Sequence, residues 1–155
     1  MTQKTTVDAA EGQHDIFINR VFDLPVDLLF KAYSEPALLA QWMGTKVLRL
    51  DNKAQGGWEF ETSDPQGNVV FKAHGSIHAF LPGQKIIRTF EMANAPFGVQ
   101  LEILEFEALT DSTSKLRMHT VYETVALRDE MLKLPFRQGL NMAHNRLQEV
   151  IAKLV

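Results

Sequence analysis

The five histidines are the first candidates for chemistry, because imidazole binds metal ions and exchanges protons near neutral pH. His74 and His78 lie four residues apart in a predicted strand, so their side chains share one face. A metal site needs three or four converging ligands, and Lys72 and Ser76 occupy the same face. We interpret this face as a solvated outer surface, and the sequence predicts no bound metal.

Two other histidines could face the interior of the protein. His119 lies between Met118 and Thr120 in the last predicted strand, where it would be hydrogen-bonded within the core or available to a ligand. His144 borders the apolar face of the predicted C-terminal helix and could reach the same space. Both are therefore candidates for polar contacts with a ligand.

The carboxylates show no pattern typical of acid–base catalysis, which needs them paired in an apolar pocket. Glu102, Glu105 and Glu107 share one predicted strand, in which Glu105 and Glu107 alternate with Leu104 and Phe106 and are interpreted as an exposed stripe. The sequence contains no nucleophile elbow, phosphate-binding loop or dinucleotide-binding glycine pattern. It therefore predicts no catalytic residue and no cofactor, and it favours a protein that is not an enzyme.

Composition limits the class of protein further. The chain has 155 residues, no cysteine and a net charge of −3, which fits one globular domain without disulfides or thiolate metal sites. There is no basic stripe for nucleic acid and no apolar run long enough to span a membrane. We expect a cytoplasmic protein with a flexible polar leader at residues 1–13 and one domain at residues 14–155.

The elements that would position these residues follow from the periodicity of apolar side chains. Two short helices are predicted within residues 25–42, after a first strand at residues 14–23, and a long C-terminal helix is predicted at residues 136–153. Further strands are predicted at residues 47–51, 58–63, 69–80, 85–92, 99–109 and 115–124. Short turns between them imply antiparallel pairing. We expect an α+β helix-grip fold, with a curved antiparallel sheet of six to seven strands wrapped around the C-terminal helix and two short helices after strand one.

Several short motifs follow one another along residues 14–154 in a characteristic order. Their residues are Arg20, Phe22, Pro25, Leu29, Phe30, Ala32, Glu35, Pro36, Leu38, Trp42, Asp51, Gly56, Gly57, Glu59, Phe60, Gly75, Ile77, Pro82, Gly83, Arg88, Thr89, Phe90 and Gly139. In this order and spacing they resemble the START-like superfamily, also called SRPBCC or Bet v 1-like, and within it the small bacterial proteins of the Hsp90 ATPase activator homologue branch. Two positions that often hold tryptophan in this branch are Met43 and Phe90 here.

The resemblance implies an apolar cavity between the sheet and the C-terminal helix that holds a small hydrophobic molecule. The ten Phe and six Met residues are consistent with such a cavity, although plain core packing would also use them. Trp42 would close one end. The expected ligand-binding residues are Trp58, Phe60, Phe71, Phe90, Met118, His119, Tyr122, Phe136 and Leu140.

Two alternatives stay open alongside ligand binding. The eukaryotic relatives of this branch stimulate the ATPase of a heat-shock chaperone, so the resemblance also allows a chaperone-associated partner-binding module. Some members of the superfamily are enzymes of the cyclase or aromatase type. The expected partners are a small hydrophobic molecule and, as alternatives, a chaperone or a second copy of the chain, but neither nucleic acid nor a membrane.

Overall fold

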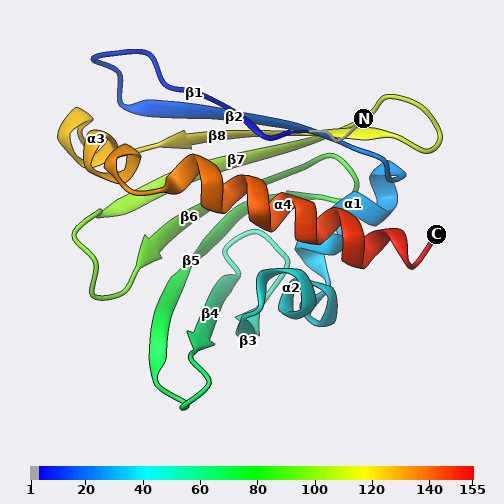
Figure 1. The fold of residues 1–155 in the computed structure, drawn as a ribbon, viewed down its shortest axis with the longest axis horizontal. Helices are drawn as coiled ribbons and strands as arrows, with labels where there is room; N and C mark the ends of the chain where they lie inside the picture. Colours follow the sequence, from blue (N-terminus) through cyan, green and yellow to red (C-terminus); the bar gives the residue numbers. More distant parts are fainter. Residues whose placement is uncertain (1–3) are drawn as a thin grey trace.

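One antiparallel sheet forms the larger layer of the molecule, and the longest helix lies across it (Figure 1). The computed structural model describes residues 4–155, which contain eight strands and four helices. The strand order is β1-β2-β8-β7-β6-β5-β4-β3, so chain neighbours pair throughout except where β2 joins β8. The strands are β1 (Thr6–Asp8), β2 (Asp15–Phe22), β3 (Lys46–Leu50), β4 (Gly57–Ser63), β5 (Val69–Leu81), β6 (Lys85–Met92), β7 (Val99–Ala108) and β8 (Ser114–Val121).

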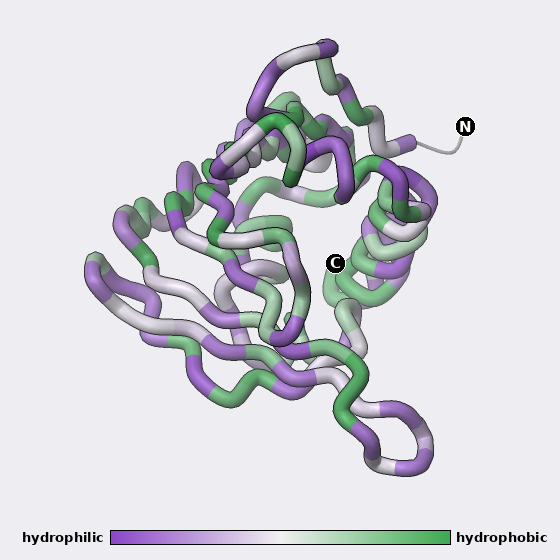
Figure 2. Tube along the Cα trace, turned by 90° about the vertical axis from the view of Figure 1, so that its left-hand side faces the viewer, coloured by the Kyte–Doolittle hydropathy of each residue, from purple (hydrophilic) through white to green (hydrophobic). Residues whose placement is uncertain are grey.

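Alternation of side chains decides which face of the sheet is buried. In β8, Leu116, Met118 and Thr120 are buried, while the residues between them are partly or fully exposed. Figure 2 shows the same alternation of hydrophilic and hydrophobic residues along the strands. Because successive side chains in a strand point to opposite faces, this pattern fixes the even-numbered residues of β7 and β8 on the inner face.

The helices cover the inner face of the sheet. Helices α1 (Val26–Ser34) and α2 (Pro36–Met43) connect β2 to β3 and pack against the long helix α4 (Phe136–Ala152), which follows α3 (Val125–Lys133). Trp42 at the end of α2 is buried, and its indole Nε1 donates a hydrogen bond to the carbonyl oxygen of Ala32 at 2.7 Å. These contacts confirm the predicted α+β class and are consistent with the helix-grip arrangement.

The prediction of six to seven strands was wrong by one strand, and the two short helices follow the second strand rather than the first. All seven predicted strands are present, and the additional strand, β1, lies within the predicted flexible leader. Val7 is buried, Thr6 pairs with Asn19, and the backbone N–H of Thr5 donates to Asn141 Oδ1 at 2.9 Å. Residues 4–13 therefore include an ordered edge strand, while residues 1–3 of the predicted leader lie outside the described part of the chain.

The two halves of α4 differ in their burial. Leu147 and Ile151 in the second half are fully buried. Leu140 in the first half is only half-buried, although the apolar stripe predicts full burial, and Leu154 is exposed. The reason lies in the packing. Helices α1 and α2 contact α4 and lie beside its C-terminal half (Figure 1), whereas Phe136, Gly139, Leu140 and Ala143 of its first half border an open space.

Candidate functional site

A cavity of about 280 Å³ lies between the inner face of the sheet and the segment that joins α3 to α4. We call it the inner cavity. Strands β2, β6, β7 and β8 form one wall, and residues from α3 to the first turns of α4 form the other. Its lining residues are Ile18, Phe90, Met92, Gln100, Glu102, Met118, Thr120, Tyr122, Met131, Leu134, Phe136 and Leu140.

A second hollow of about 660 Å³ lies beside the inner cavity and reaches the surface. We call it the outer groove. Leu134, which is 47% exposed, and Pro135 form its solvent-facing side. Met131, Leu134, Phe136 and Leu140 line both spaces, so the outer groove and the inner cavity adjoin along these residues. Its lining residues are Phe71, Met131, Leu134, Pro135, Phe136, Gly139, Leu140 and Ala143.

Aromatic residues of β4 and β6 support the apolar wall of the inner cavity. Phe90 faces the cavity, and its ring centroid lies 5.4 Å from that of Trp58. Trp58 in turn packs on Phe60 at 4.8 Å, and both are fully buried. Gly56 and Gly75 admit this arrangement, because a Cβ at either position would collide with a backbone carbonyl, that of Asp51 or Thr89 respectively. The sequence therefore places Trp58 behind the lining of the cavity.

The sheet also contributes a polar patch to the inner cavity, formed by Gln100, Glu102, Thr120 and Tyr122. Gln100 and Glu102 are two residues apart in β7 and share its inner face. Glu102 pairs with Thr120 of β8 in the register of the sheet. All four side chains are buried, so these polar groups are surrounded by the apolar residues that line the rest of the cavity.

The negative charge of Glu102 in this patch is paired with Arg88 of β6. Arg88 Nε donates a hydrogen bond to Glu102 Oε1 at 2.9 Å, and the side chains are 9% and 10% exposed. The guanidinium of Arg88 also lies 4.9 Å from the ring centroid of Trp58. The ion pair is thus held between the aromatic wall and the polar patch.

Two members of the polar patch are free to interact with a ligand. Gln100 Nε2 is buried and has no hydrogen-bond partner among residues 4–155. Burial, with a further contribution from the negative charge of Glu102, raises the pKa of the Tyr122 phenol above its ordinary value. Tyr122 therefore stays protonated and can donate as well as accept a hydrogen bond.

The structure brings together six of the nine predicted ligand-binding residues. Phe90, Met118, Tyr122, Phe136 and Leu140 line the inner cavity, and Phe71 lines the outer groove. The other two apolar predictions, Trp58 and Phe60, lie behind Phe90 as described above.

The ninth predicted residue, His119, lies on the outer face of the sheet, so its predicted inward orientation was wrong. Its ring stacks on Phe17 at a centroid distance of 4.2 Å, and its Nε2 lies 2.8 Å from Asp15 Oδ2. The cause is the two-residue period of the strand, which sends His119 and the cavity-lining Met118 to opposite faces.

His144 is buried but is not among the residues that line the cavity. Its Nδ1 lies 2.6 Å from Thr5 Oγ1, and its Nε2 lies 3.5 Å from the Tyr33 hydroxyl. Burial, followed by the nearby charge of Arg20, lowers the pKa of His144 to about 3. This histidine therefore links α4, as a neutral side chain, to Thr5 just before β1 and to Tyr33 of α1.

The prediction gave no ligand-binding role to Gln100 or Glu102. It interpreted Glu105 and Glu107 as exposed, which the structure confirms, but it did not extend the alternation to Glu102. The signal was present in the sequence of β7. Counting by two from the apolar Phe106 and Leu104 reaches Glu102 and Gln100, whereas Glu105 and Glu107 fall on the opposite face.

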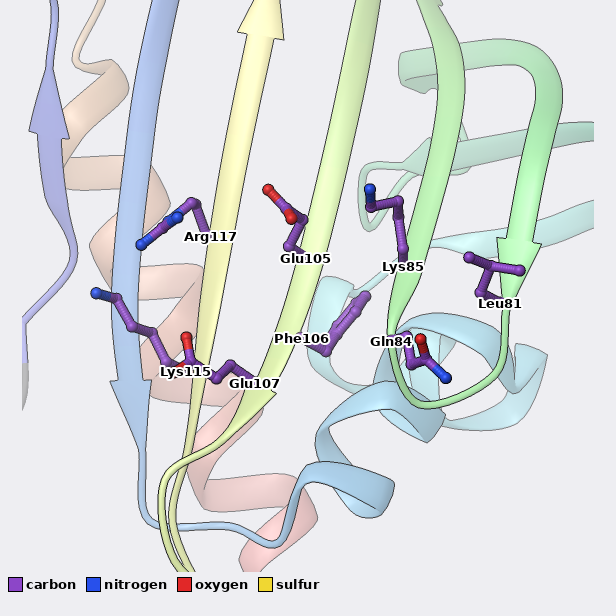
Figure 3. Close-up of a pocket in the computed structure, with 8 residues that line it drawn as sticks. All are labelled: Leu81, Gln84, Lys85, Glu105, Phe106, Glu107, Lys115 and Arg117. Atoms are coloured by element: carbon purple, nitrogen blue, oxygen red, sulfur yellow. The ribbon is translucent and has the colours of Figure 1, made fainter.

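A hollow of about 420 Å³ on the outer face of the sheet is a less suitable site (Figure 3). Lys85 and Arg117 flank Glu105 across three strands, and Lys115 pairs with Glu107 in the register. Because opposite charges alternate there, the hollow offers neither an apolar wall nor a field of one sign. His74 and His78 are exposed on the outer face of β5, as predicted.

Two further features of the chain concern metal ligands and membrane-spanning helices. Within residues 4–155, no group of three or more His, Asp or Glu side chains could hold a metal ion. No helix in the same part of the chain is long and apolar enough to cross a membrane.

Comparison with known proteins places the chain in a family. The family model described as "Activator of Hsp90 ATPase homolog 1-like protein" matches residues 23–152. The chain belongs to this family. As a family member it has the START-like, or Bet v 1-like, fold that its structural neighbours share.

The individual relatives support the fold, and their names state no activity. A crystal structure of a Rhodobacter sphaeroides protein superposes with a TM-score of 0.86 at 18% identity, covering 97% of this chain and 99% of that one. Protein Ms6760 from Mycobacterium smegmatis gives 0.83 at 17% identity, covering 95% and 96%. An uncharacterized Schizosaccharomyces pombe protein is 30% identical over 112 residues, which are 72% of this chain but 31% of that protein. The chain thus spans about a third of this curated relative.

Proposed function

We propose that the protein binds a small, mainly apolar molecule in the inner cavity, with the outer groove as the entrance. The observation that carries the proposal is the unfilled space of about 280 Å³ between the sheet and α4, bordered by Phe90, Met118 and Leu140. A core that served packing alone would be filled to the density of an organic crystal. Small-molecule sites are commonly apolar hollows with a few polar groups, as here.

The size of the site sets the expected affinity. Burying about 300 Å² of apolar ligand surface contributes roughly 7 kcal/mol at ~25 cal/mol per Å² before the costs of association. The net dissociation constant is then roughly micromolar for a ligand that makes apolar contacts alone. Hydrogen bonds to the polar patch would lower it further.

A neutral fluorescent dye, N-phenyl-1-naphthylamine, tests the proposal. The dye should show saturable fluorescence enhancement with one site per chain. Leu140→Trp places a larger side chain in the opening between groove and cavity and should abolish this enhancement. Met142→Trp is the matched control, because Met142 lies on the same helix and is 62% exposed.

The two variants separate cavity binding from surface binding. Loss of dye binding in Leu140→Trp with retention in Met142→Trp supports the proposal. Equal dye binding by the wild type and by a folded Leu140→Trp variant contradicts it.

The family description supports a second candidate, a module that binds and stimulates a chaperone ATPase. Val69 and Val70 at the start of β5 are 52% and 63% exposed and offer an apolar contact at the tip of a hairpin. ATP hydrolysis by Hsp90 with and without the protein tests this candidate. Stimulation that is lost in Val70→Glu supports it, and an unchanged ATPase rate rules against it.

A further inference from the structure

We infer that the ligand of the inner cavity carries an uncharged hydroxyl group, which hydrogen-bonds to Gln100 and Glu102. This inference rests on the proposed function and narrows it from apolar molecules in general to apolar alcohols and phenols. It arises from the polar patch, which a purely hydrocarbon ligand would leave unsatisfied.

The first requirement on the ligand, that it accepts a hydrogen bond, comes from Gln100. Its side chain is 3% exposed, lines the inner cavity, and leaves Nε2 without a partner among residues 4–155. A buried N–H without a hydrogen bond destabilises a protein, so such groups are rare without a reason. A ligand oxygen that accepts from Nε2 would supply the missing partner.

Glu102 provides the second requirement, that the ligand also donates. Arg88 occupies Glu102 Oε1, and no described residue hydrogen-bonds to Oε2. A carboxylate accepts hydrogen bonds only, so the ligand group beside it must carry a proton. A ligand carboxylate would instead meet the negative charge of Glu102 in a buried space, which is unfavourable.

The spacing of the two side chains suits a single ligand atom. Residues two apart in a strand are separated by about 6.6 Å. Two hydrogen bonds through one oxygen, each about 2.8 Å, span roughly 4.6 to 5.6 Å. The ends of the two side chains therefore need to lean toward each other by only about 1 to 2 Å relative to the backbone spacing. A hydroxyl accepts from Gln100 and donates to Glu102 through one atom, and the neighbouring Tyr122 and Thr120 can complete its surroundings.

Three ligands of one shape test the inference in the wild-type protein: naphthalene, 2-naphthol and 2-naphthoate, titrated by calorimetry at pH 7. We expect 2-naphthol to bind at least about tenfold more tightly than naphthalene, since a tenfold ratio corresponds to one net hydrogen bond. We expect 2-naphthoate to bind more weakly than 2-naphthol.

Variants assign the preference to the polar patch. Gln100→Leu removes the amide at similar size and should reduce the preference for 2-naphthol over naphthalene to about threefold or less. Gln84→Leu is the control, because Gln84 is exposed at the turn before β6. Glu102→Gln leaves Arg88 without its counter-charge and should shift the preference toward 2-naphthoate.

The outcomes distinguish this inference from the function on which it rests. Equal wild-type affinities for naphthalene and 2-naphthol overturn the hydroxyl inference and leave cavity binding in place. A preference that persists in folded Gln100→Leu also overturns it. If none of the three ligands binds, both the inference and the proposed function fail.

Discussion

Arg88 on β6 and Glu102 on β7 form a buried ion pair, with Nε and Oε1 2.9 Å apart, at the wall of the inner cavity. The two residues are direct neighbours in the register of the sheet. The largely apolar lining of the cavity thus includes the carboxylate of Glu102, which Arg88 contacts at one of its two oxygens. We expect both the stability of the fold and the proposed ligand preference to depend on this pair.

Removing one partner of the pair should destabilise the fold strongly. Glu102→Leu leaves the guanidinium of Arg88 buried without a counter-charge, and we expect a loss of ~3–5 kcal/mol in the free energy of unfolding. The double variant Arg88→Met/Glu102→Leu should recover most of that loss, because no charge remains buried. Urea denaturation measures both.

The exposed pair between Arg49 and Asp51 serves as the control for this cycle, since their side chains are 63% and 41% exposed. Asp51→Asn should change the free energy of unfolding by ~0–1 kcal/mol. A double variant as unstable as Glu102→Leu alone would contradict the assignment.

Acid should destabilise the protein through His144. Its pKa is lowered to about 3 in the folded state, mainly by burial, while an unfolded histidine titrates near ~6.5. Above that pH neither state binds the proton, and the contribution of the neutral ring is complete. As the pH falls from about 6.5 toward 3, the unfolded chain gains a proton that the folded protein excludes. The free energy of unfolding should then fall by up to ~1.4 kcal/mol per pH unit.

Variants at two histidines measure this contribution. His144→Gln removes the titrating group and should flatten the dependence of the free energy of unfolding between pH 7 and 5. His78→Gln, at an exposed position on the outer face of β5, should leave it unchanged. The same slope in wild type and His144→Gln would show that other groups govern acid unfolding.

Both tyrosines should resist alkaline titration. Burial raises the pKa of Tyr33 and of Tyr122 above the ordinary value, and the chain has no other tyrosine. Absorbance at 295 nm should therefore show no phenolate in the folded protein at pH values where urea-unfolded protein is half ionised, about 10. Because both pKa values are raised, their contribution to stability is complete below about pH 10 and is lost above it. Phenolate absorbance from folded protein near pH 10 would contradict the burial of at least one ring.

The sequence was sufficient to predict most of the fold, because long strands and the terminal helix have clear periodicities. It failed at β1, whose three residues are too few to form a period and are fixed by tertiary contacts such as Arg137 Nη1 to the Val7 carbonyl oxygen at 2.8 Å. Their polar composition alone led to the prediction of a flexible leader.

The residues predicted to bind a ligand include several that line the inner cavity, but only Tyr122 of the polar patch. Apolar residues were assigned by type, and the structure places Phe90 and Met118 at the cavity wall. Polar residues depend on which face of a strand they occupy, and strict alternation would have rejected His119 and selected Glu102. The partial exposure of Leu140 could not be predicted, because it depends on which part of α4 the other helices leave uncovered.

Truncation of two leucines of α4 should distinguish a core position from a cavity position by the loss of stability. Leu147→Ala removes a fully buried side chain and should cost ~2–5 kcal/mol in the free energy of unfolding. Leu140→Ala enlarges a space that is already open, so its cost should be about 1 kcal/mol, while dye affinity changes. Thermal unfolding and dye titration of both variants provide the comparison. Equal losses of stability would mean that Leu140 is packed as tightly as Leu147.

Two glycines should respond in opposite directions to the same substitution. A Cβ at Gly75 would collide with the Thr89 carbonyl oxygen and lie 2.7 Å from Trp58 Nε1. Those two groups share a hydrogen bond of 3.0 Å, so Gly75→Ala must displace the indole from behind Phe90. We expect a loss of about 3 kcal/mol, within the range for overpacking a core, together with a shift in tryptophan emission.

Gly139 provides the matched case, because it lies in α4 and a Cβ there would meet nothing within 4 Å. Gly139→Ala should stabilise the protein by ~0.5–1 kcal/mol, since alanine restricts the unfolded chain more than glycine does. It should leave tryptophan emission unchanged, because Gly139 borders the outer groove rather than the aromatic wall. If Gly75→Ala were as stable as Gly139→Ala, Trp58 would not be held against β5 and β6, and the aromatic wall of the inner cavity would not exist as described.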